Sequence, residues 1–206
     1  MQRRQFIKAS MGVAATALAG SLLIPKLTAD DKKKTPKNMK KILILNGSPR
    51  KNGKTASLVN AFKEGAESAG NQVQELYLQG MHIGGCLACE YCQMHDGNCV
   101  QKDDMTILYE AFKQADVVVF ASPQFWGTIS GQLKSVIDRL YALLFKYSSQ
   151  YRKQFVVIMT SRGDMYDMTE EFFSIFNKYL GWENIGNVLG AGKEAQAKQL
   201  GASIGA

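Results

Sequence analysis

The sequence of 206 residues predicts an α/β protein, a three-layer sandwich in which helices cover both faces of a five-stranded parallel sheet. Two observations lead to this prediction. Apolar runs recur along the chain, and continuous apolar runs are typical of strands that are buried on both faces. Helical segments with one apolar face separate these runs, and parallel strands need such crossover helices. No internal repeat or second domain is visible, so we expect a single folded domain.

The predicted strands and helices alternate in strict order. The strands are expected at 41–46, 72–78, 116–121, 155–159 and, more weakly, 184–189, and the first, third and fourth of them are apolar runs. The helices, each with apolar residues on one face, are expected at about 55–69, 103–114, 131–146 and 169–180, followed by a short, frayed helix at the C-terminus. Asp103 or Asp104 caps the second of these helices. In such a sheet, ligands bind where the strand order reverses, at the carboxyl ends of the strands.

The loop after the first strand has the composition of a phosphate-binding loop. It reads NGSPRKNGKTA, and its small residues and the helix start can present backbone N–H groups to a phosphate. Ser48 and Thr55 can add hydroxyl hydrogen bonds, and Arg50 or Lys54 can balance the charge. The two glycines are separated by five residues, one more than in the nucleotide-binding P-loop, so a flavin phosphate fits better than a nucleoside triphosphate. A simple turn is the alternative.

The loop after the third strand places two aromatic side chains side by side. Phe125 and Trp126 follow a proline and precede Gly127. Exposed aromatic residues are unfavourable unless they cover something flat, such as an isoalloxazine ring, and Gly127 would let the backbone approach the ring edge. The turn after the fourth strand, with Thr160 and Gly163, is expected on the other side of the ring. Alternatively, the two aromatic residues fill the core or an oligomer interface.

All four cysteines lie within fourteen residues, as a C-x2-C-x2-C-x6-C array. This spacing suits a [4Fe–4S] cluster, because thiolates from one tight loop can bind several irons together. Structural zinc sites more often pair two C-x2-C motifs across a longer stretch. Two disulfides are a third reading, in an oxidising compartment. The spacing favours iron and leaves the other two readings open.

The N-terminus has the order of an export signal. Arg3 and Arg4 precede a weakly apolar run, 9–24, which is shorter than the about 20 residues of a membrane span. We expect 1–29 to be a twin-arginine signal peptide and 30–40 a polar linker. The protein would then be periplasmic or tethered to the membrane by an uncleaved signal. An amphipathic helix is the alternative.

The positive charge is confined to the same region. The net charge of the whole chain is +7, but residues 1–41 carry +8 and the remainder carries −1. A nearly neutral domain argues against nucleic-acid binding. We expect the protein to contact a membrane only during export or through an uncleaved signal peptide. Residues 41–206 are long enough for one domain with a sizeable core.

Four segments, in this order, resemble the NADPH-dependent FMN reductase group of flavodoxin-like proteins, in its iron–sulfur flavoprotein branch. They are Asn46–Arg50, Cys99–Met105, Ser122–Gly127 and Leu133–Arg139, and the resemblance covers about 40–190. It implies FMN, the flavodoxin-like strand order 2-1-3-4-5 and homodimers or homotetramers.

The resemblance also implies the site residues. The phosphate loop falls on Ser48, Arg50, Lys54, Thr55 and Ala56, and the ring loop falls on Pro123, Gln124, Phe125, Trp126 and Gly127. The four ligands of a [4Fe–4S] cluster fall on Cys86, Cys89, Cys92 and Cys99.

The sequence therefore predicts an exported FMN oxidoreductase that also carries a cluster. The flavin would do the chemistry, so no catalytic side chain is expected. NAD(P)H or a redox protein would donate electrons, and flavin-type or quinone-type compounds would accept them. Two alternatives are a non-enzymatic electron carrier and an FMN-only quinone or nitro reductase with idle or disulfide-bonded cysteines.

Overall fold

The computed structural model describes residues 39–205, except for the side chains of residues 146 and 147. The predicted signal peptide, 1–29, and nearly all of the predicted linker, 30–40, lie outside the described residues. Five parallel strands form one sheet in the order β2-β1-β3-β4-β5, which confirms the predicted fold and strand order. The strands are β1 (Lys41–Asn46), β2 (Gln72–Tyr77), β3 (Val117–Pro123), β4 (Gln154–Thr160) and β5 (Glu183–Leu189).

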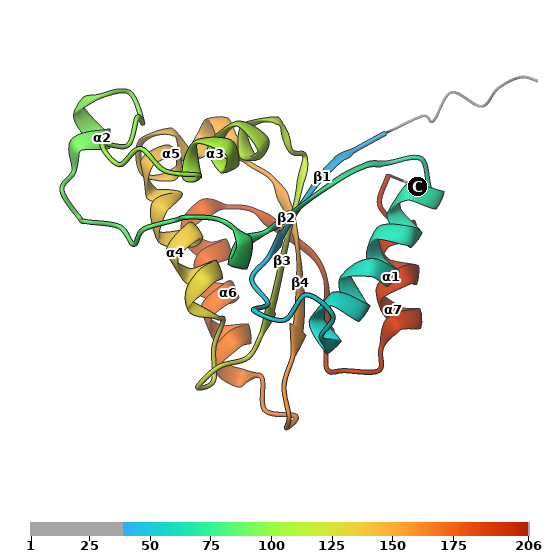
Figure 1. The fold of residues 1–206 in the computed structure, drawn as a ribbon. Helices are drawn as coiled ribbons and strands as arrows, with labels where there is room; N and C mark the ends of the chain where they lie inside the picture. The colour runs from blue at the N-terminus through green and yellow to red at the C-terminus, as the bar shows by residue number, and fades with distance from the viewer. Residues whose placement is uncertain (1–38, 206) are drawn as a thin grey trace, which may run out of the picture. The chain divides into compact units, whose positions relative to one another are not determined.

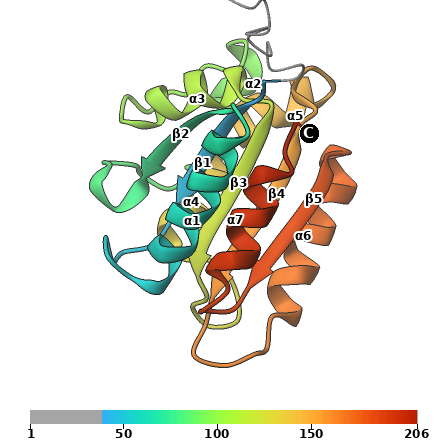
Figure 2. The ribbon, with the colours of Figure 1, turned by 90° about the vertical axis from the view of Figure 1, so that its right-hand side faces the viewer.

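Helices cover both faces of this sheet (Figures 1 and 2). One face carries α1 (Lys54–Ser68) and α7 (Glu194–Ala202). The other carries α3 (Met105–Gln114), α4 (Gly131–Arg139) and α6 (Asp167–Leu180). The shorter elements are α2 (Tyr91–Met94), α5 (Tyr141–Tyr147) and two 3₁₀ turns, η1 (Leu78–Gly80) and η2 (Ser148–Tyr151). No helix within residues 39–205 is long and apolar enough to cross a membrane.

The strands divide their side chains between two hydrophobic cores. Successive residues of a strand point to opposite faces of the sheet. Leu43 and Leu45 of β1 accordingly belong to the core under α3, α4 and α6, whereas Ile42 and Ile44 belong to the core under α1 and α7. All four side chains are at most 2% exposed, as the continuous apolar run predicts.

The C-terminal helix is packed tightly, so the prediction of a frayed helix is wrong. A Cβ atom on Gly65 of α1 would lie 2.0 Å from the carbonyl oxygen of Lys198, and one on Gly201 of α7 would lie 2.1 Å from that of Phe62. Two glycines therefore let the backbones of α1 and α7 touch. A helix with a weak apolar pattern is held by backbone contact rather than by large side chains.

The long helix predicted at 131–146 is two helices. α4 ends at Arg139 and α5 begins at Tyr141, with Leu140 between them at ψ −14°. Leu140 N–H still donates to Val136 O at 2.9 Å and also to Ile137 O at 3.2 Å, which tightens the turn. The apolar pattern continues across this bend, so the pattern alone could not reveal it.

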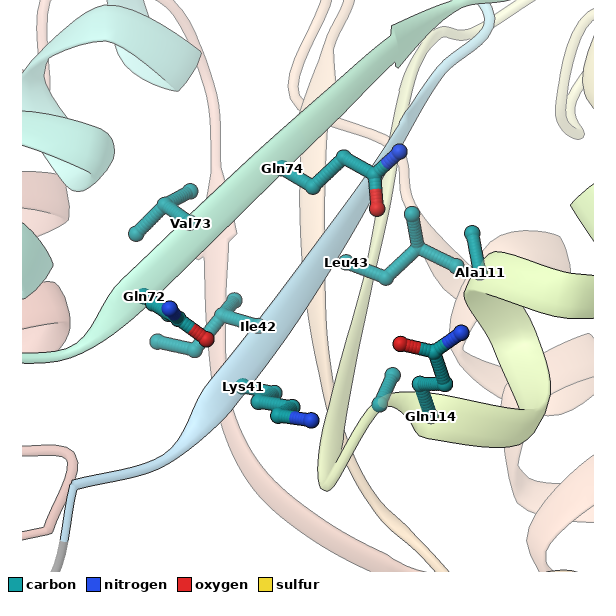
Figure 3. Close-up of a pocket in the computed structure, with 9 residues that line it drawn as sticks. Lys41, Ile42, Leu43, Gln72, Val73, Gln74, Ala111 and Gln114 are labelled. Carbon is teal, nitrogen blue, oxygen red and sulfur yellow. The ribbon is translucent and has the colours of Figure 1, made fainter.

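A groove of about 330 Å³ lies between β2, β1 and α3 (Figure 3). Leu43 and Ala111 contribute apolar side chains, and Gln72, Gln74 and Gln114 contribute amides. Lys41 and Gln72, the first residues of their strands, also line it, so it lies toward the amino ends of β1 and β2. The groove is therefore not the ligand site expected at the carboxyl ends.

Candidate functional site

The loops that follow β1, β3 and β4 meet at the carboxyl edge of the sheet. The hydroxyls of Thr55, in the first turn of α1, and Thr160, at the end of β4, lie 2.7 Å apart. The backbone N–H of Gln124, directly after β3, donates to Thr160 O at 2.7 Å. Thr160 therefore ties all three loops together beside the reversal of strand order between β1 and β3, where doubly wound sheets bind ligands.

Ser130, at the N-cap of α4, fixes the first and third strand ends to each other. Its hydroxyl donates to Gly47 O at 2.7 Å, and its N–H donates to the hydroxyl of Ser122 at 2.9 Å. A Cβ atom on Gly47 would lie 2.7 Å from both Ser130 Oγ and Leu133 Cβ. The loop thus packs as closely on α4 as glycine allows.

The predicted phosphate loop leaves the N-terminus of α1 open to an anion. Gly53 caps α1 without any side-chain hydrogen bond, so the N–H groups of the first turn have no side-chain acceptor there. Arg50 and Lys54 are exposed, and among residues 39–205 neither forms an ion pair. The helix dipole, the N–H groups and two cations together are the features that favour binding of an anion.

The predicted hydroxyls of this loop shape it from inside. Ser48 is buried, and its hydroxyl donates to Arg50 O at 3.1 Å and accepts from Arg50 N–H at 3.2 Å. The Thr55 hydroxyl is paired with that of Thr160, and Ala56 is 7% exposed. Arg50 and Lys54 are thus the predicted loop residues whose side chains are free to reach a ligand.

The ring loop turns sharply and presents Trp126 to solvent. Phe125 and Thr128 exchange backbone hydrogen bonds of 2.8 and 3.1 Å across a two-residue turn, with φ +50° at Trp126 and +83° at Gly127. A bulky residue in this left-handed region carries strain of about 1–3 kcal/mol, which surrounding structure must hold in place. Trp126 is 99% exposed, so it does not fill the core.

Gln124 brings an unused hydrogen-bond acceptor into the ring loop. Its Nε2 donates to Met165 O at 2.8 Å, which fixes the amide and ties the loop to the turn after β4. Its Oε1 is buried and has no hydrogen-bond partner within the described part of the chain. Phe125 and Trp126 of the ring loop expose apolar surface, and so does Met168, whose Sδ packs against Gly127 of the same loop. A ligand with one flat apolar face and an N–H donor suits this loop.

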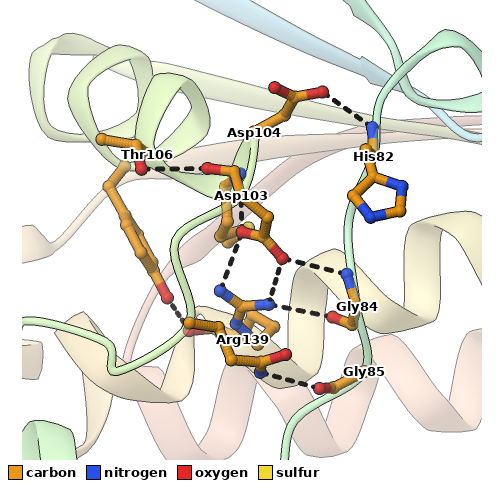
Figure 4. A network of polar contacts seen from close by, with 10 residues as sticks. His82, Gly84, Gly85, Asp103, Asp104, Thr106 and Arg139 are labelled. Carbon is orange, nitrogen blue, oxygen red and sulfur yellow. Dashed lines mark hydrogen bonds and ion pairs between the residues drawn. The ribbon is translucent and has the colours of Figure 1, made fainter.

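A buried ion pair clamps together the two ends of the cysteine loop, predicted at 82–104 (Figure 4). Arg139, the last residue of α4, faces Asp103 with two hydrogen bonds of 2.9 and 3.1 Å, and its Nη1 also donates to Gly84 O at 3.0 Å. Asp103 in turn accepts from the N–H groups of Gly84 and Met105. The clamp therefore joins the start of the loop, its end and α4.

This network holds both charges at neutral pH. Burial alone would raise the pKa of Asp103, but hydrogen bonds from Arg139, Gly84 and Met105 outweigh it and lower the pKa below the ordinary 3.8. Burial alone would lower the pKa of Arg139, but the hydrogen bond to Asp103 raises it overall. Burial raises the pKa of Tyr109, whose hydroxyl donates to Arg139 O at 3.0 Å.

The four cysteines line one hollow beside this clamp. Cys86, Cys89, Cys92 and Cys99 share it with Arg139 and with apolar residues such as Leu87, Val100 and Ala142. All four are free thiols. In the described chain no three His, Cys, Asp or Glu side chains lie close enough to hold a single metal ion. A four-iron cluster does not require such closeness, because each thiolate binds a different iron.

The backbone of the cysteine loop adopts unusual conformations between its ligands. Ala88 and Glu90, which flank Cys89, have φ +50° and +53°, and Asp96 and Gly97 have φ +52° and +79°. Left-handed non-glycine residues are strained and gather at functional sites. The donor set, the common hollow and this backbone all fit a [4Fe–4S] cluster.

Comparison with known proteins decides the family. The model of the NADPH-dependent FMN reductase family matches residues 40–196. The chain belongs to this family. The family is one of oxidoreductases, which agrees with the class of enzyme predicted from the sequence.

Individual relatives extend this result. An iron-sulfur flavoprotein of Archaeoglobus fulgidus is 35% identical over 102 residues, which are 50% of this chain and 46% of that protein. An iron-sulfur flavoprotein of Methanocaldococcus jannaschii is 33% identical over 124 residues, 60% of this chain and 62% of that protein. The chain thus spans about half to three fifths of the length of these relatives. An NAD(P)H:quinone oxidoreductase from Methanothermobacter marburgensis shares the fold, with a TM-score of 0.66, 18% identity and coverage of 81% of this chain and 97% of that one.

The structure collects most of the predicted residues at two places. The loop residues after β1, β3 and β4 lie at the carboxyl edge, and the four cysteines lie at the hollow; Gly163 lies in the exposed turn after β4. Arg139 and Asp103 were not among the predicted site residues. Arg139 ends one of the four segments that carry the family resemblance, and the structure shows that it pairs with Asp103 of the cysteine loop. The one sequence signal for this ion pair was Asp103, an acidic residue that lies shortly after the last cysteine.

Proposed function

We propose that this protein is an exported FMN-dependent oxidoreductase that also carries a [4Fe–4S] cluster. Its family, and relatives named iron-sulfur flavoproteins, support the proposal. The observation that supports it most strongly is the anchoring of two different loops on Thr160. This residue joins the open N-terminus of α1 to the ring loop, so a phosphate site and a flat-ring site share one edge.

The residues at this edge suit FMN in three ways. The first-turn N–H groups of α1, with Arg50 and Lys54, would bind the phosphate. The unpaired Oε1 of Gln124 would accept a hydrogen bond from an N–H of the isoalloxazine ring. Phe125 and Trp126 would cover the ring and exclude water. When bound, FMN would supply hydride acceptance and one-electron transfer.

The residues of the hollow suit a cluster. Cys86, Cys89, Cys92 and Cys99 would each bind one iron, and the clamp between Arg139 and Asp103 would hold the loop in register on α4. The cluster would supply single-electron transfer. Leu87, Val100 and Ala142 would limit the access of water to it.

The two sites lie at opposite ends of α4 (Figure 1). Ser130 at its N-cap is fixed to the phosphate loop, and Arg139 at its last turn lines the cysteine hollow. A nine-residue helix is about 13 Å long, so the cluster of one chain would be remote from its own flavin. We therefore propose a homodimer or homotetramer, in which the cluster of one chain lies closer to the flavin of another. Light scattering of the protein with both cofactors bound should give the mass of a dimer or a tetramer.

Either NAD(P)H or a redox protein would be the electron donor, with flavin-type or quinone-type acceptors. Steady-state assays with quinone and ferric acceptors distinguish an enzyme, which turns over, from a carrier, which is reduced once. We expect turnover.

Binding of FMN and of riboflavin to the full chain tests the flavin site directly. Fluorescence titration should show tighter binding of FMN, because riboflavin lacks the phosphate. Lys54→Gln should reduce this preference about tenfold, as expected when one charge-assisted hydrogen bond is lost. Lys63→Gln, which removes a half-buried lysine that pairs with Glu67 on the same helix, serves as the matched control. Folded protein that binds neither compound would overturn the proposal.

A further inference from the structure

Arg139 has one hydrogen-bond donor that the clamp does not use. Its terminal nitrogens, Nη1 and Nη2, face the Asp103 carboxylate end-on, and Nη1 also donates to Gly84 O. This geometry leaves the Nε side of the planar guanidinium open. Nε is buried and finds no acceptor anywhere in residues 39–205, although the side chain is only 1% exposed.

An unpaired N–H in a protein interior is unfavourable and points to a missing partner. Arg139 lines the hollow of the four cysteines, where many of the other side chains are apolar. Three other lining residues carry oxygen acceptors, Glu90, Tyr141 and Gln101, the last of which donates from Nε2 to Gly85 O at 2.9 Å. Four lining residues offer sulfur, whereas a carboxylate, an amide and a phenol are each offered by one, so sulfur is the kind of acceptor that most of the polar lining residues share.

We propose that the Nε–H of Arg139 donates a hydrogen bond to a sulfur atom of the cluster and thereby raises the reduction potential of the cluster. The inference rests on the proposed function, because it assigns a role to a residue beside the proposed cluster. One-electron reduction adds one negative charge to the cluster. A fixed cation and a hydrogen bond to sulfur stabilise that charge more than they stabilise the oxidised state.

The clamp makes Arg139 suited to this role. Asp103 uses the far end of the guanidinium, so the side chain cannot swing toward solvent when the charge of the cluster changes. A preorganised donor needs no rearrangement during electron transfer. Arg139 would thus connect the geometry of the loop to the electronic properties of the cluster.

The test is a potentiometric titration of the cluster, with mediators and a chemical reductant, in full-chain protein of measured iron content. Arg139→Gln should lower the equilibrium constant for one-electron reduction about tenfold, a shift of about 59 mV to more negative potential. Lys134→Gln removes the same charge from the same helix, at an exposed lysine that pairs with Asp138, and should leave the potential unchanged. Asp103→Asn removes a negative charge but keeps the Nε–H, so it should move the potential in the positive direction.

Each outcome decides the inference. A potential in Arg139→Gln equal to that of the wild type overturns it, as does a negative shift of equal size in Asp103→Asn, which would indicate a loosened loop. If Arg139→Gln loses its iron, Arg139→Lys is titrated instead, because it keeps the charge but lacks the Nε–H. A lowered potential in this variant supports the inference, and a wild-type potential overturns it. Iron loss in both Arg139 variants would show that Arg139 serves to retain the cluster rather than to set its potential, which overturns the inference. Wild-type protein without iron would overturn the proposed cluster itself, which is a different result.

Discussion

At the scale of single residues, substitution of Asp103 should strongly reduce the stability of the protein. It receives hydrogen bonds from Arg139, Gly84 and Met105, and its side chain is 9% exposed. Asp103→Asn would leave the charge of Arg139 buried and incompletely paired, which should lower the free energy of unfolding by about 3 kcal/mol. Asp138→Asn, which breaks the exposed pair with Lys134, should cost less than about 1 kcal/mol. Urea unfolding of both variants measures this difference, and equal stabilities would contradict the role of the clamp.

The same residue gives the clamp a pH dependence. Because the folded-state pKa of Asp103 lies below its ordinary 3.8, its stabilising contribution is complete above that value and is lost as the pH falls through the folded pKa. The stability difference between the wild type and Asp103→Asn should therefore be constant from pH 7 to 5 and shrink below about pH 4. Thermal unfolding of both proteins across this range is the measurement. A difference that persists unchanged to pH 2.5 would argue against this assignment.

At the scale of helices and strands, the contact between α1 and α7 depends on glycine. Gly201→Ala would place a Cβ atom 2.1 Å from Phe62 O, so the helices must separate. Overpacking of this kind should destabilise the protein by about 1–3 kcal/mol. Gly131→Ala makes the same change in a helix where nothing lies within 4 Å of the new Cβ, and it should be neutral or stabilising. Chemical denaturation should rank the two variants in this order; the opposite order would show that α7 is loosely attached.

The elements also show what the sequence can predict. The five strands lie within two residues of the predicted bounds at each end, and β1, β3 and β4 gave the clearest pattern, because buried parallel strands are continuous apolar runs. The bend at Leu140 was not predictable, since apolar residues continue on both sides of it. The packing of α7 was missed for a similar reason: it depends on close approach to Gly65, far away in the sequence. Both features arise from contacts that no local pattern records.

Only part of the candidate site could be predicted from the sequence. Its position followed from the strand ends, because loops after neighbouring parallel strands share one edge of the sheet. The individual roles of Ser48, Thr55 and Thr160 did not follow, since the Ser48 hydroxyl bonds to the backbone of its own loop and the two threonine hydroxyls bond to each other. The ion pair of Arg139 could not be predicted, because its partner, Asp103, lies 36 residues earlier in the chain.

At the scale of the whole molecule, export is the part of the proposal that depends on the N-terminal segment. Replacing Arg3 and Arg4 by lysine keeps the charge but removes the paired arginines that the twin-arginine translocase reads. We expect the precursor of this variant to accumulate in the cytoplasm, whereas replacement of Lys32 and Lys33 by arginine should leave export unchanged. Cell fractionation measures both, and normal export of the first variant would contradict the predicted signal.

The central claim is that one chain holds both a flavin and an iron–sulfur cluster. Its most direct test is anaerobic purification of the full chain, followed by measurement of FMN, iron and acid-labile sulfide per chain. We predict about one FMN and about four irons with matching sulfide, and loss of the iron but not the FMN in Cys89→Ala. Less than one iron per chain, with thiols that titrate as two disulfides, would contradict the account and leave a flavin reductase without a cluster.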